Sequence, residues 1–165
     1  MDSKELRNLY ANLLARSMID SEKDKVHPAF VGIIKQLNPD EAKLIKTFLT
    51  KHDYPLIDVR RLNADGSFVY VLYNFTSITE GICDRDSAMD TRAYIDNLCR
   101  LKIIEIQEDR RLAEKGIYTP LEKHDIVTSI IKEKLSEGQC WDIEQKKFEI
   151  TSFGREFINI CVRDL

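Results

Sequence analysis

The 165-residue sequence lacks the patterns that mark most enzymes and membrane proteins. Its six glycines stand apart from one another, so no glycine-rich loop is present to cradle a phosphate group. None of its three histidines belongs to an H-E-x-x-H or comparable metal-binding pattern. No apolar run approaches the roughly 20 residues that a membrane-spanning helix needs. We therefore expect a protein with no enzymatic activity, no cofactor, no metal and no membrane segment.

The chain also has few cysteines and a small net charge. Cys83, Cys99, Cys140 and Cys161 are far apart and form no C-x-x-C pair, which favours reduced thiols over a disulfide framework. No basic stretch typical of a signal peptide follows Met1, so we expect a cytoplasmic protein. The net charge of −3 provides no overall attraction to nucleic acids.

Helical spacing dominates the first 50 residues. Apolar residues three and four positions apart predict a helix over residues 6–18. Pro28 indicates the start of a second helix. Asn38, Pro39 and Glu41 have the order of a capping box at the start of a third helix. Residues 1–50 are therefore predicted to form a helical part.

Two strands are predicted next. Residues 55–62 alternate partly, and residues 67–75 follow after an Asp-Gly turn. The second run is apolar on both faces, which is typical of a strand that is covered on both sides. We therefore expect its aromatic side chains to pack in the core. They are Phe68, Tyr70, Tyr73 and Phe75.

The last third of the chain has the order of elements found in a winged-helix domain. A helix over about residues 89–101 leads into a strand at 103–106, and a strand at 141–150 leads into a capped final helix. Between them, an inserted helix is predicted at about residues 121–136. We predict one compact α+β domain over residues 1–165, in which residues 54–165 form a winged-helix-like region with a small mixed or antiparallel sheet beside the helical N-terminal bundle.

In a winged-helix domain that reads DNA, the helix at residues 89–101 would enter the major groove. The basic residues in and beside this helix are interleaved with an equal number of carboxylates, which leaves little attraction for phosphate. The residues concerned are Arg85, Arg92, Arg100 and Lys102 with Asp84, Asp86, Asp90 and Asp96. The segment 108–115, at the position of a wing tip, balances its arginines with acids in the same way.

Six residues are candidates for contact with a partner. Five are arginines on the predicted strands, helix and wing, and the sixth is the tryptophan, a residue type that is enriched at protein interfaces. The balanced charges favour a protein partner or self-association over nucleic acid. The candidates are Arg60, Arg61, Arg92, Arg110, Arg111 and Trp141.

Three blocks of the sequence resemble the abortive infection alpha (Abi-alpha) family of bacterial proteins. They are residues 6–16 (LRNLYANLLAR), 27–42 (HPAFVGIIKQLNPDEA) and 150–158 (ITSFGREFI), and the resemblance runs over residues 5–162. It implies that the chain is the C-terminal portion of a longer protein with a part in phage defence. It brings no catalytic residues.

We therefore expect a non-catalytic interaction or sensing module of a phage-defence protein. The alternative is a winged-helix DNA-binding transcriptional regulator, which would need the five candidate arginines to form one basic stripe. An enzyme would need a pocket that brings one histidine to a cysteine or to a pair of acids.

Overall fold

The computed structural model describes residues 3–82 and 88–164. Ahead of the first strand lie α1 (Lys4–Ser17), the short 3-10 turn η1 (Lys23–Lys25), α2 (Ala29–Gln36) and α3 (Pro39–Thr47). The predicted capping box is present at α3, where Asn38 and Glu41 exchange two hydrogen bonds of 2.8 Å. Because both donors would otherwise lack partners at a helix end, this exchange fixes where α3 begins.

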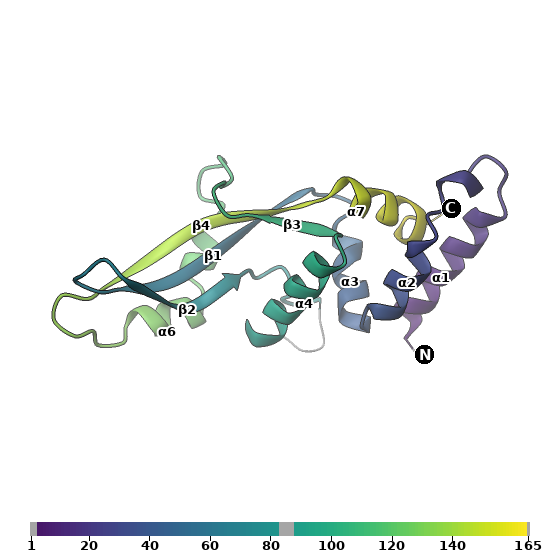
Figure 1. Ribbon diagram of the computed structural model, residues 1–165. Helices are drawn as coiled ribbons and strands as arrows, with labels where there is room; N and C mark the ends of the chain where they lie inside the picture. Colours follow the sequence, from purple (N-terminus) through teal and green to yellow (C-terminus); the bar gives the residue numbers. More distant parts are fainter. Residues whose placement is uncertain (1–2, 83–87, 165) are drawn as a thin grey trace.

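Within the described ranges, four strands form one antiparallel sheet in the order β2-β1-β4-β3. They are β1 (Asp53–Leu62), β2 (Phe68–Phe75), β3 (Ile104–Gln107) and β4 (Cys140–Ile150). β1 pairs with β4 along its whole length, and the two make the long central ribbon of Figure 1. The α+β class is confirmed, and the sheet, predicted as mixed or antiparallel, is antiparallel.

The predicted order of elements is present around the β3–β4 pair. α4 (Ala88–Arg100) leads into β3, and β4 leads into α7 (Ser152–Phe157) and the π-helix η2 (Ile158–Val162). The winged-helix assignment itself remains a prediction.

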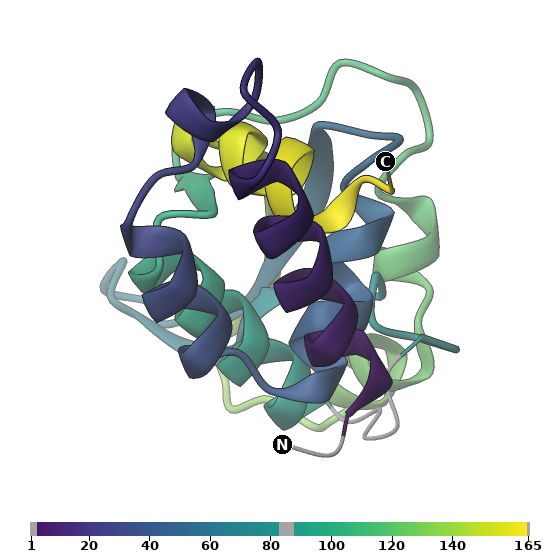
Figure 2. The same ribbon diagram turned by 90° about the vertical axis from the view of Figure 1, so that its right-hand side faces the viewer.

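The two ends of the chain meet at the helical end of the molecule. Figure 2 looks onto this end, with α1 in purple and the C-terminal helices in yellow. Asn12 donates to the carbonyl of Cys161 at 3.0 Å, and Arg16 donates to the carbonyl of Arg163 at 3.0 Å. Side chains of α1 thereby supply partners to carbonyl groups in and just after the final helix.

The sheet separates two hydrophobic clusters. Successive residues of a strand point to opposite faces, so Leu56 and Ile57 belong to different clusters. Leu56 joins the larger cluster with α1–α4 and α7. Ile57 joins the smaller cluster, which α5 (Thr119–Glu122) and α6 (Asp125–Ile131) cover from the other side.

The prediction of a single inserted helix at residues 121–136 is wrong. The segment forms α5 and α6, separated at His124, whose extended backbone and ring nitrogen cap the first turn of α6. α6 then ends at Ile131, whose side chain is exposed. The spacing of the apolar residues alone did not show that His124 ends one helix and caps the next.

The expectation that β2 is a covered strand with its aromatic residues in the core is also wrong. Of its four aromatic residues only Phe75, at the end of the strand, is buried. The exposed fractions of Phe68, Val69, Tyr70 and Val71 are 40–49%. β2 is an edge strand that pairs with β1 alone, so its apolar sequence does not mean burial on both faces.

Candidate functional site

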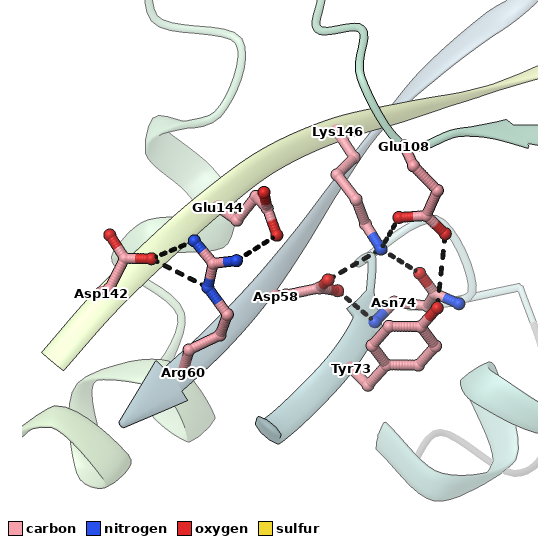
Figure 3. A network of polar contacts seen from close by, with 8 residues as sticks. All are labelled: Asp58, Arg60, Tyr73, Asn74, Glu108, Asp142, Glu144 and Lys146. Atoms are coloured by element: carbon pink, nitrogen blue, oxygen red, sulfur yellow. Dashed lines mark hydrogen bonds and ion pairs between the residues drawn. The ribbon is translucent and has the colours of Figure 1, made fainter. Parts of the chain in front are cut away.

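One face of the sheet is covered by helices at one end and carries charged side chains at the other. At the covered end, Leu56 and Phe148 are buried in the larger cluster. Further along the same face the strands carry acids and bases, and two of the acids, Asp142 and Glu144, have side chains that are 34% and 35% exposed. We call this end the open face (Figure 3). It comprises Asp58 and Arg60 of β1 and Asp142, Glu144 and Lys146 of β4.

Lys146 is fully buried at the centre of a polar network. Its ammonium group lies 2.8 Å from Asp58, 2.9 Å from Glu108 and 2.7 Å from the amide oxygen of Asn74. It also lies 4.4 Å from the centre of the Tyr73 ring. Burial by itself would lower the pKa of Lys146, but the hydrogen bonds and charges of Asp58 and Glu108 outweigh burial and raise that pKa. Lys146 is therefore charged at neutral pH.

Irregularities in β2 bring Asn74 into this network. The pairing of β1 with β2 shifts by one residue between Tyr70 and Leu72 and by one more between Leu72 and Phe75. Asn74 has a φ of 53°, a left-handed conformation that asparagine tolerates better than most residues. In this conformation its backbone N–H donates to Asp58 at 2.8 Å. The buried ion pair is thus also hydrogen-bonded to β2.

Arg60 occupies the outer part of the open face. Its guanidinium donates to Asp142 at 2.9 Å and lies 2.9 Å from Glu144. It also lies over the ring of Phe68, at 4.9 Å from the ring centre. The Arg60 guanidinium is therefore already bound by two carboxylates and covered by an aromatic ring, which leaves it little capacity to bind a phosphate group.

Aromatic side chains of β2 line the edge of the open face. Phe68 and Tyr70 have ring centres 5.3 Å apart, and Tyr70 and Tyr73 have ring centres 4.9 Å apart. Arg92 of α4 lies over Tyr73 at 5.3 Å. Val69 and Val71 lie between these aromatic residues in β2, and both are exposed.

β2 is also open along its outer edge. Among the described residues it hydrogen-bonds to β1 on one side, and no strand lies on the other side. None of its eight residues is charged, and none is proline. Edge strands of monomeric proteins usually carry such residues, because they prevent pairing with another chain.

The candidate residues from the sequence do not gather at one place: three lie on β1 and β4, one on α4 and two in the loop after β3. Arg60 and Arg92 lie at the open face. Arg61 follows Arg60 in β1 and therefore points to the opposite face of the sheet, where it lies across from Trp141 of β4. Arg110 is exposed in the loop after β3, and Arg111 contacts Gln145 at 3.4 Å. The five arginines do not form one stripe. Arg92 lies 3.7 Å from Asp96, one turn further along α4. Cys83, Asp84, Arg85 and Asp86 lie outside the described residues.

The Lys146 network was not predicted. A signal for it existed in β1, where Asp58 stands in an apolar run and faces inward, so it needs a buried partner. The sequence does not identify that partner, because Lys146, Asn74 and Glu108 come from three other segments.

The histidines lie apart. His27 and His52 line separate cavities of about 460 and 240 Å³, and His124 contacts Glu80. The larger cavity also has two acids in its lining, Asp24 and Glu156. The ring of His27 accepts the Ala29 N–H at 3.1 Å, which occupies one of its nitrogens.

Two of the cysteine thiols have raised pKa values, and the described residues contain no metal-binding cluster. Burial raises the pKa of the Cys99 thiol to about 11 and that of Cys161 to about 12, so both are protonated at neutral pH. No group of three or more His, Cys, Asp or Glu side chains is placed to hold a metal ion in the ranges that the structure covers. None of the helices described is long and apolar enough to cross a membrane.

A family model, described as abortive infection alpha, matches residues 1–161. The chain belongs to the abortive infection alpha family. No curated protein matches it. Among solved structures, it is similar to an uncharacterized protein from the hydrocarbon-degrading marine bacterium Alcanivorax borkumensis SK2, with 13% identity over 81% of this chain and 92% of that chain and a TM-score of 0.47.

In this member of the abortive infection alpha family, the closing block of the sequence has a clear structural role. Thr151 caps α7 by accepting the Gly154 N–H at 2.8 Å. A Cβ atom on Gly154 would lie 2.1 Å from the carbonyl oxygen of Ile103. Only glycine allows α7 to approach the connection between α4 and β3 this closely.

Proposed function

We propose that this chain is a non-catalytic protein-interaction module of a bacterial phage-defence protein, and that β2 with the open face is its contact surface. Membership of the abortive infection alpha family supports the link to phage defence. The observation that carries the contact role is the exposure of residues 68–71 on both faces of an edge strand without charge or proline.

The charges at the surface support a protein partner over nucleic acid. The side chains of Asp142, Glu144 and Glu108 are 34–55% exposed, whereas Lys146 is fully buried and Arg60 lies under Phe68. Apart from Arg92, which is exposed beside Asp96, a phosphate backbone at the open face would meet carboxylates before it met a cation. A polypeptide can pair with the edge of β2 through its main chain and place apolar side chains beside the aromatic row.

The absence of a catalytic role is part of the proposal and has a direct test. The cavity beside His27 combines a histidine with two acids, Asp24 and Glu156. His27→Asn keeps an acceptor for the Ala29 N–H but removes the imidazole. We expect this variant to protect cells against phage as well as the unmodified protein does. Loss of protection by a variant with an unchanged melting temperature would favour an enzyme.

The contact surface can be tested in cells that carry the intact protein and are challenged with a phage that it restricts. Tyr70→Lys places a charge on the exposed edge without a change in the core, and Leu14→Lys places the same charge on an exposed position of α1. We expect the plating efficiency of the phage to rise for Tyr70→Lys and to stay low for Leu14→Lys.

A photo-crosslinking side chain at position 70 adds a physical readout. It should form a covalent adduct with a protein, whereas the same side chain at position 14 should not. Equal protection by both lysine variants, together with no adduct at position 70, would show that β2 is not the contact surface.

A further inference from the structure

We infer that the occupant of the β2 edge is a second copy of this chain, paired antiparallel about a two-fold axis at Val69. The inference rests on the proposed function of β2 as a contact surface and names the partner. It makes β2 an internal strand of one sheet that continues through both copies.

The lack of charge in β2 favours pairing with itself. A two-fold interface brings the same patch of both copies together, so any charge near the axis would face its own copy. The sequence of β2, FVYVLYNF, carries no charge, so self-pairing is free of this repulsion. The exposed carboxylates of the open face, Asp142 and Glu144, lie on β4, on the far side of β1 from this edge, and Asp58 of β1 is buried against Lys146.

Strand geometry selects the register. In an antiparallel pair, residues directly opposite each other point to the same face of the sheet. An axis at Val69 therefore pairs Phe68 of each copy with Tyr70 of the other, and it pairs Val69 with itself on the opposite face. Cross-strand aromatic pairs of this kind stabilise sheets. An axis at Tyr70 would instead pair Phe68 with Leu72, which lies beyond the first shift in the β1–β2 pairing, where the regular pairing ends.

The charges next to the paired segment are complementary in this register. With Val69 opposite itself, the turn at Asp65 of the second copy runs toward Tyr73 of the first copy. Arg92 lies over Tyr73 and is itself exposed. Its ion pair with Asp96 is long, at 3.7 Å, so the Arg92 guanidinium is available to a closer carboxylate. The two-fold axis produces this contact between Asp65 and Arg92 twice.

The oligomeric state in solution tests the inference. We expect light scattering coupled to gel filtration to give the mass of a dimer for the full chain. Val69→Lys should give a monomer, because it places two ammonium groups against each other at the axis. Leu14→Lys, with the same change of charge on α1, should remain a dimer. Circular dichroism checks that both variants are folded.

A charge exchange tests the register independently of Val69. Asp65→Lys and Arg92→Glu should each raise the dimer dissociation constant by about five-fold, since each removes two exposed ion pairs. The double variant should restore the dissociation constant of the unmodified chain. If it does not, the register about Val69 is wrong.

A chain that is monomeric at its highest soluble concentration, or a dimer that Val69→Lys does not weaken, overturns the inference. A monomer whose phage protection still depends on Tyr70 would leave the proposed contact surface in place with another protein as its partner. A dimer that Val69→Lys dissociates without loss of protection would support self-pairing and contradict the proposed function.

Discussion

Lys146 joins three separate segments, because its ammonium group binds Asp58 of β1, Asn74 of β2 and Glu108 after β3. Lys146→Met would leave Asp58 buried without a cation. Breaking a buried ion pair from one side costs about 3–5 kcal/mol, and we expect a loss of this size in the free energy of unfolding. Unfolding in urea, followed by circular dichroism, measures it.

The neighbouring residue provides the control. Lys147 also pairs with two acids, Asp53 and Glu149, but those acids are partly exposed. Lys147→Met should therefore cost no more than about 1 kcal/mol. Equal losses for the two variants would mean that the buried pair contributes no more than a surface pair.

The raised pKa of Lys146 has a consequence at alkaline pH. A lysine whose pKa is higher in the folded chain than its ordinary value of 10.5 stabilises the fold fully below that value, and this stabilisation is lost as the pH rises through the folded pKa. The difference in unfolding free energy between the unmodified chain and Lys146→Met should therefore shrink above a pH of about 10.5. A difference that stays constant through the alkaline range would contradict the assignment of the charge to Lys146.

At the scale of single elements, two glycines in helical segments have opposite roles. A Cβ on Gly154 would collide with the backbone of Ile103, whereas a Cβ on Gly32 in α2 would meet no atom within 4 Å. Gly154→Ala should lower the unfolding free energy by about 1–3 kcal/mol through overpacking. Gly32→Ala should raise it by about 0.5–1 kcal/mol, because alanine restricts the unfolded chain and favours the helix. Thermal melts of the two variants should shift in opposite directions.

Local signals in the sequence were sufficient to place several elements. The capping box at Asn38 fixes the start of α3, and the Asp-Gly turn fixes the β1–β2 connection, because both depend on neighbouring residues only. The helix–strand order around β3 and β4 was likewise visible. The final helix was predicted to be capped, and Thr151 is the residue that caps α7.

Features that depend on distant segments were not visible. An apolar run such as β2 has the same sequence pattern whether it lies inside a sheet or at its edge, so its exposure could not be deduced. The Lys146 network depends on the two shifts in the β1–β2 pairing and on Glu108 in the loop after β3. The candidate arginines were found, but their separation follows from strand pairing that the sequence does not specify.

At the scale of the whole molecule, the two hydrophobic clusters differ in size, and the smaller one rests on two short helices. Stability is rarely uniform when one part of a fold buries fewer apolar side chains. We expect amide hydrogens of α5 and α6 to exchange faster than those of α1 and α3, and those of β1 and β4 to exchange slowest, because these strands contribute to both clusters. Hydrogen exchange with mass spectrometry resolves these segments.

Two matched core substitutions separate local from global opening. Val127 is fully buried in the smaller cluster and Leu44 in the larger one. Val127→Ala should speed exchange in α5 and α6 and leave α1 and α3 unchanged, because the smaller cluster can open while the larger one stays packed. Leu44→Ala removes about 2–5 kcal/mol from the larger cluster, on which the whole fold depends, and should speed exchange in every segment. If Val127→Ala speeds exchange equally everywhere, the two clusters unfold as one unit, and the β1–β4 ribbon couples them more tightly than their separate packing implies.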